Sequence, residues 1–146
     1  MSAVSEIKLR LLAAPTPFTA VLGATSLAQI KDGGKPEPAA PVAYVLTARE
    51  ASADNERMTG SVLQRSERDI LVAIYTEHLG DPMGGDAEDE LEALKAFVRT
   101  RLIGWSTTDM NGEPITHVAG EVADARAGGV WFEDTFSAPT YIQEQP

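Results

Sequence analysis

The chain has 146 residues, of which 43% are hydrophobic and 23% are charged. This length favours one domain, residues 1–146, with its own hydrophobic core. Cysteine is absent, which excludes disulfides, thiolate catalysis and cysteine-ligated metals and suits a reducing compartment. Charged residues interrupt the first apolar stretch, so we expect neither an ordinary signal peptide nor a transmembrane helix.

The net charge of −10 is unevenly distributed along the chain. Residues 1–78 hold nine acids and eight bases, whereas residues 79–146 hold thirteen acids and four bases. A chain this acidic is repelled by nucleic acid and by anionic membranes. The asymmetry predicts one acidic face, which is either a solvated surface that aids solubility or a face that meets a basic protein partner.

The first elements are predicted to be helical. Residues 4–14 place apolar side chains at helical spacing, with Ser2 or Ser5 as the N-cap and Pro15 after the end. A second short helical piece is predicted within residues 22–30. Glycine and proline make residues 32–38 a loop.

Two strands are predicted next. Residues 42–46 form a short strand, and the polar residues 48–60 form a long exposed connection. Residues 62–76 form the clearest strand, with a polar first half and an apolar second half, residues 70–75. A strand of this length would span about 50 Å. We therefore expect its polar half to project beyond the core as one strand of a β-hairpin arm.

A turn at residues 79–85 precedes an amphipathic helix at residues 86–103. Asp86 is the expected N-cap, and acids in the first turn with bases in the later turns match the helix dipole. Phe97 is expected to join the buried side of the helix. The predicted core side of the helix and its end are Leu91, Leu94, Val98, Leu102, Gly104 and Trp105.

The remaining residues predict two antiparallel strands, 115–126 and 129–142, joined near residues 127–129. The fold class is therefore α+β. We expect a mixed, mainly antiparallel sheet flanked by two to three helices, with the projecting hairpin arm.

No catalytic or ligand-binding pattern stands out. The two histidines, His78 and His117, are far apart and lack metal-ligand spacing. The acids at residues 86–92 lack the pattern of an EF-hand and are explained by a helix N-terminus. No glycine-rich phosphate loop or nucleophile elbow is present. We predict no catalytic residue, no cofactor and no metal.

Taken in order, these segments resemble one protein family. A polar-then-apolar strand at residues 65–78 comes first, followed by a helix that ends in the Leu-Ile-Gly-Trp sequence of residues 102–105. A strand introduced by Pro114 and an aromatic strand at residues 130–136 complete the series. Over about residues 40–137 the chain resembles the tail terminator proteins of long-tailed phages, in particular the Mu-like prophage group.

This resemblance implies a small α/β structural protein of the virion that forms a hexameric ring. Such a ring caps the finished tail tube, stops its polymerisation and joins the head. The implied partners are copies of the chain itself, the tail tube protein and a head–tail connector or neck protein. DNA would pass through the ring without specific binding, and no membrane is involved. The implied location is the tail–neck region, with assembly in the host cytoplasm.

The polar arm and the aromatic strand are the candidate subunit interface. Charges of alternating sign on the arm can pair across a repeated heterologous contact, so charge reversal at Arg68 is expected to impair assembly but not folding. The alternatives are another neck or head–tail completion protein, or a small acidic protein-binding module. An enzyme is disfavoured. The proposed interface residues are Arg57, Arg65, Glu67, Arg68, Asp69, Trp131 and Phe132.

Overall fold

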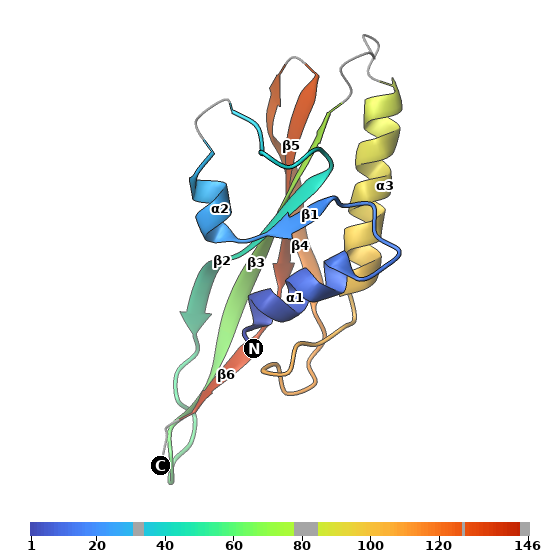
Figure 1. The fold of residues 1–146 in the computed structure, drawn as a ribbon. Helices are drawn as coiled ribbons and strands as arrows, with labels where there is room; N and C mark the ends of the chain where they lie inside the picture. Colours follow the sequence, from blue (N-terminus) through green and yellow to red (C-terminus); the bar gives the residue numbers. More distant parts are fainter. Residues whose placement is uncertain (31–33, 78–84, 127, 144–146) are drawn as a thin grey trace.

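The computed structural model describes residues 1–30, 34–77, 85–126 and 128–143. Within these residues the chain forms three helices and six strands (Figure 1). The side chains of residues 85–87 are outside the description. The elements in chain order are α1 (Ala3–Leu12), β1 (Ala20–Leu22), α2 (Ala24–Ala28), β2 (Val42–Ser52), β3 (Leu63–Glu77), α3 (Gly85–Leu102), β4 (Thr116–Arg126), β5 (Gly129–Ser137) and β6 (Thr140–Gln143).

All six strands belong to one mixed sheet with the order β1-β2-β3-β5-β4. Only the β1–β2 pair is parallel among the pairs described, and β6 pairs with the first residues of β3. The predicted α+β class with a mixed, mainly antiparallel sheet and flanking helices is confirmed. The predicted hairpin between residues 115–126 and 129–142 corresponds to β4 and β5, which pair from Thr116↔Ser137 to Arg126↔Gly129.

The main core lies between the sheet and helices α1 and α3. Ile70, Val72 and Ile74 alternate along β3 and are fully buried, as period-two geometry requires of one face of a strand. Ile7 and Leu11 of α1 pack onto the same cluster. From α3, Leu94, Val98 and Leu102 are buried in it, while Leu91, Phe97 and Trp105 are partly buried against it.

A second, smaller cluster lies on the opposite face of the sheet. Val42 and Tyr44 of β2 and Ala73 of β3 are buried there, and Leu27 of α2 packs against them. Trp131 of β5 extends this cluster, with its ring centroid 4.9 Å from that of Tyr75. Because α2 is short, the helices protect one face of the sheet far more completely than the other (Figure 1).

The ends of the two long helices follow local rules. Ser2, one of the two predicted caps, accepts a hydrogen bond from the Ser5 amide at 3.1 Å. After α3, Gly104 adopts a φ of 86°, which side chains other than glycine rarely tolerate. Its amide donates to the carbonyl of Ile115, at 2.9 Å. This turn directs the chain back toward the sheet.

Three predicted elements differ from the structure. β2 continues to Ser52, so residues 48–52 are strand rather than the predicted loop. Residues 20–22 form a strand, not the helical piece predicted to include Leu22. Residues 129–142 divide into β5 and β6. Of the turn predicted at residues 79–85, residues 79–84 lie outside the described residues and Gly85 is the first residue of α3; the side chain of the predicted cap, Asp86, is also outside the description.

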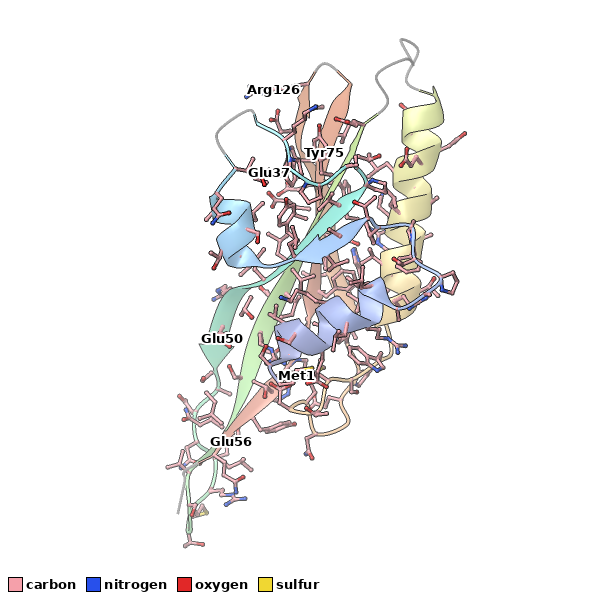
Figure 2. The ribbon with its side chains drawn as sticks, viewed as in Figure 1. Met1, Glu37, Glu50, Glu56, Tyr75 and Arg126 are labelled. Carbon is pink, nitrogen blue, oxygen red and sulfur yellow. The ribbon has the colours of Figure 1, made fainter. Side chains whose placement is uncertain are left out.

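The predicted arm is present and has more strands than expected. The polar halves of β2 and β3 pair from Arg49↔Asp69 to Ser52↔Ser66, beyond the part of the sheet that the helices cover. β6 adds a third strand on the other side of β3, from Leu63↔Gln143 to Ser66↔Thr140. Glu50 and Glu56 mark this arm in Figure 2, whereas Arg126 lies at the opposite end of the molecule.

Candidate assembly interface

The tip of the arm is the loop between β2 and β3, and every residue from Ser52 to Ser61 is exposed. Met58 exposes 98% of its surface. Arg57 donates from Nη1 to the carbonyl of Ser61 at 3.2 Å, which closes the loop on itself. Asn55 accepts from the amide of Leu63 at 3.2 Å. The tip therefore contacts little besides itself.

The root of the arm is fixed to the core by Arg68. Its Nη1 and Nη2 donate to the two carboxylate oxygens of Asp109 at 2.8 and 3.1 Å, and its Nε donates to the carbonyl of Ala138 at 2.9 Å. The side chain of Arg68 is only 7% exposed. The arginine also lowers the pKa of Asp109 from its ordinary value of 3.8, because the hydrogen bond favours the charged carboxylate.

This geometry corrects the expectation for Arg68. The sequence placed its charge on the arm surface, available to a neighbouring subunit. The structure instead buries the guanidinium within the chain and uses all three donor groups internally. Reversing this charge would leave Asp109 facing another carboxylate, so the change is expected to impair folding as well as assembly.

A second ion pair lies farther along the arm. Arg65 donates from Nη2 to a carboxylate oxygen of Glu113 at 2.8 Å, and the hydroxyl of Tyr141 on β6 donates to the other oxygen. Arg65 also contacts Glu67. The pKa of Glu113 falls below its ordinary value of 4.5, chiefly because of the Arg65 hydrogen bond. This network joins β3, β6 and the loop before β4.

The other proposed interface residues lie in different environments. Glu67 has a side chain that is 52% exposed, and Asp69 is half-buried beside Arg49 in the paired strands. Trp131 is half-buried in the smaller cluster. Phe132 is only 5% exposed and faces the main core, where Lys95 lies 4.5 Å from its ring centroid. Phe132 therefore offers no surface to another subunit.

A buried carboxylate connects α3 to the two strands at the edge of the sheet. Asp134 of β5 is fully buried and accepts two hydrogen bonds from Arg99 of α3, both at 3.0 Å. Nε2 of His117 lies 2.7 Å from the same carboxylate. A Cβ atom on Gly120 would lie 2.9 Å from Asp134, so the site requires glycine there. The cluster has the character of a structural tie, because the buried carboxylate of Asp134 is fully partnered by Arg99 and His117.

These partners cannot be recognised from the sequence alone. His117 was considered as a possible functional group, but Asp134, Arg99, Asp109 and Glu113 were not paired with anything. No spacing rule connects residues as distant as Arg68 and Asp109. Among the described residues there is no group of three or more potential metal ligands, and no helix is long and apolar enough to cross a membrane. His78 lies outside the described residues.

Comparison with known proteins decides the family. The chain matches the model of the phage tail terminator protein family over residues 1–146. It belongs to that family. The family consists of structural phage tail proteins, which favours a role other than catalysis. The match identifies the family but not a subgroup, so membership of the Mu-like prophage group stays a prediction.

A solved structure has the same fold. This tail terminator family member is similar to a chain from the virion of a native gene transfer agent particle, with a TM-score of 0.56 and 18% sequence identity. The similarity covers 97% of this chain and 100% of that chain. At this identity the comparison supports the fold. The comparison with curated proteins gave no match.

Proposed function

We propose that this protein is a tail terminator that forms a homo-hexameric ring on the finished tail tube. The ring ends polymerisation of the tube and offers its other surface to the head–tail connector or neck protein. The family match over the whole chain carries this proposal. The protein acts as one domain, residues 1–146, with no enzymatic step and no cofactor.

The shape of the molecule supports an assembly role. An arm held at its root by Arg68 and farther along by Arg65, with an exposed tip, is suited to reaching a neighbouring molecule without a large ordering cost. Met58 and Arg57 at the tip are the contact residues we propose, together with Glu67 along the arm. Asp69 and Trp131 contribute where the half-buried face of the sheet meets another subunit.

The charge distribution supports passage of DNA through the ring. The net charge is −10, and most of the excess acid lies in residues 79–146. Acidic side chains along a central channel would repel the DNA backbone and prevent specific binding. We place the ring at the tail–neck region of the virion, after assembly in the host cytoplasm.

The experiment is tube growth in the presence and absence of this protein. The tail tube protein from the same genome is polymerised alone and together with the full chain, and tube lengths are measured by electron microscopy. Tubes that stop growing and carry the protein at one end support termination. Unchanged length with no bound protein contradicts it, and binding to the connector alone favours another neck component.

A matched control separates specific recognition of the tube from non-specific electrostatic binding. Glu88→Arg changes the net charge as much as reversal of an acidic residue on the arm would. Glu88 is exposed on α3, away from the arm. The variant should end tube growth as the natural chain does. If Glu88→Arg loses the ability to end tube growth to the same extent as charge-reversal variants of the arm, the loss comes from the change in net charge.

A further inference from the structure

Several strand edges are unpaired within the described residues, and two of them, on β4 and β2, are the longest. β4 is the terminal strand on one side, and all its residues are exposed except the half-buried Asp124. On the other side, β1 covers β2 only at Val42–Tyr44, which leaves the outer edge of β2 free from Val45 to Ser52. Unpaired strand edges are templates for strand addition.

β4 has some of the devices that protect an edge, namely charged side chains and irregular pairing, but it lacks others. It contains no lysine and no proline, and Val118 and Val122 expose 54% and 55% of their surfaces. Its register shifts lie between His117 and Ala119 and between Val122 and Asp124. A regular segment, Ala119–Val122, remains between the two irregularities. A free edge of this kind favours pairing with another strand.

The charges at the two edges are complementary. Glu121 of β4 lies directly opposite Glu133 of β5, a like-charge pair that destabilises an isolated sheet. The described part of the chain provides no cation to either of these carboxylates. Arg49, at the start of the free regular segment of β2, is exposed and forms no ion pair with any described residue. One edge therefore carries an excess negative charge and the other carries an unpaired cation.

We propose that β4 of one copy of this chain adds to the outer edge of β2 of the next copy, with Arg49 facing Glu121. This inference rests on the proposed ring and names its contact. Strand direction permits it, since β4 is antiparallel to β2 through the successive antiparallel pairs β2–β3, β3–β5 and β5–β4. A rotation that repeats the contact closes a ring in which these two long edges are paired.

The register is specific. With Arg49 opposite Glu121, Ala51 lies opposite Ala119, and Glu50 lies opposite Gly120. The position of Gly120 lacks a side chain, and a Cβ atom there would be 3.0 Å from Nη2 of Arg99. Glu50 of the neighbouring copy therefore comes close to the paired Arg99 and Asp134, an ion pair with no net charge. The free segment of β2 ends at Val45, next to the residues that pair with β1.

The test is a charge swap in the full chain, with Arg49→Glu and Glu121→Arg made singly and together. Each single reversal should raise the dissociation constant between copies by about tenfold or more. The double variant should restore it to within about threefold of the natural chain, because the pair is re-formed with its charges exchanged. Association is measured by light scattering and sedimentation.

Two controls accompany the swap. Glu88→Arg changes the net charge as much as Glu121→Arg and should leave association unchanged. Arg49→Glu places a second acid beside Asp69, so circular dichroism and unfolding curves must show that each variant is folded. Loss of association in both single variants without recovery in the double variant would overturn the proposed register.

Cysteine cross-linking tests the same contact without relying on charge. The chain has no cysteine, so Arg49→Cys combined with Glu121→Cys introduces the only two thiols. Within one chain β2 and β4 are separated by roughly 14 Å, three strand spacings, beyond disulfide reach. Oxidation should give a ladder of multimers that ends at the closed ring, whereas Arg49→Cys with Glu88→Cys should give none.

The failures are distinguishable. Unaltered association in both single variants together with no ladder overturns the edge contact, and so does a natural chain that stays monomeric and whose cysteine variant does not cross-link. Neither result affects the tube-growth experiment. A protein that still ends tube growth after these failures keeps the proposed function and loses this contact.

Discussion

The two halves of β3 are held in place by different interactions. The half from Ile70 to Tyr75 is an apolar strand buried between helices and neighbouring strands. The half from Leu63 to Asp69 lies beyond the helices, and arginine–carboxylate pairs with β6 and the loop before β4 position it. One continuous strand thus joins a core stabilised by burial to an arm stabilised by directional polar contacts, which suits a rigid projection.

Ile74→Ala should have the largest effect, because it removes a fully buried side chain from the core half of β3. We expect the free energy of unfolding to fall by about 2–5 kcal/mol. Urea denaturation followed by circular dichroism measures this change. Ile142→Ala on β6, where the side chain is 47% exposed, is the control and should cost less than about 0.5 kcal/mol. Equal effects would contradict the division between core and arm.

Arg68→Ala should have the next largest effect, about 2–3 kcal/mol, since three charge-assisted hydrogen bonds at the root of the arm are lost. Hydrogen exchange should show faster opening of β6 and the arm half of β3, with α3 unchanged. An unfolding free energy equal to that of the natural chain would show that Arg68 is an interface residue with no role in the monomer.

Glu113→Gln should cost about 1 kcal/mol or less, because Arg65 and Glu113 are partly exposed and their ion pair is screened by solvent. The amide oxygen can still accept a hydrogen bond from Arg65, and the amide NH2 can donate to the hydroxyl of Tyr141, so the arm should keep its conformation. Denaturation at low and high salt checks this prediction. A loss as large as that of Arg68→Ala would mean that the outer pair, not the root, holds the arm.

Acid should weaken the arm before it weakens the core. The pKa values of Asp109 and Glu113 are lowered from 3.8 and 4.5. Their stabilisation is therefore complete above about pH 5 and is lost as the pH falls through the lowered values. The free energy of unfolding should decline in this range less steeply in a variant with both Asp109→Asn and Glu113→Gln. If the free energy of unfolding falls equally steeply with pH in the natural chain and the double variant, Asp109 and Glu113 do not cause the loss of stability in acid.

Met58→Ser should have the smallest effect on folding, within about 0.5 kcal/mol, because the side chain is 98% exposed. If the tip contacts a neighbouring molecule, as proposed, assembly or tube binding should weaken while monomer stability stays the same. A tube-growth assay with the folded variant separates these effects. Full activity would limit the contact surface to the rest of the arm and the sheet edges.

The sequence predicted the parts of the fold whose periodicity is strong. The helix at residues 86–103 and the strand at 62–76 carry clear patterns, and both are present as α3 and β3. The outer half of β2 cannot be predicted as a strand, because both of its faces are exposed to solvent and no apolar–polar alternation marks it. β1 and β6 are too short to show a pattern and exist because longer strands offer them an edge.

The candidate interface was less predictable. A polar arm could be inferred from the length of β3, but the direction of each arginine depends on partners far away in sequence. Arg68 finds Asp109 and Arg65 finds Glu113 across separations of 41 and 48 residues. Local sequence contains no information on such pairs. Likewise, the aromatic alternation of β5 did not reveal that Phe132 faces the core while Trp131 faces the smaller cluster.

The most direct measurement is the molar mass of the natural chain by light scattering after size exclusion, with negative-stain images of the same peak. The proposed hexameric ring predicts a mass near six times 15.6 kDa and ring-shaped particles. A chain that remains monomeric at high concentration, and that forms no ring on the ends of tail tubes, would contradict the proposed hexameric ring.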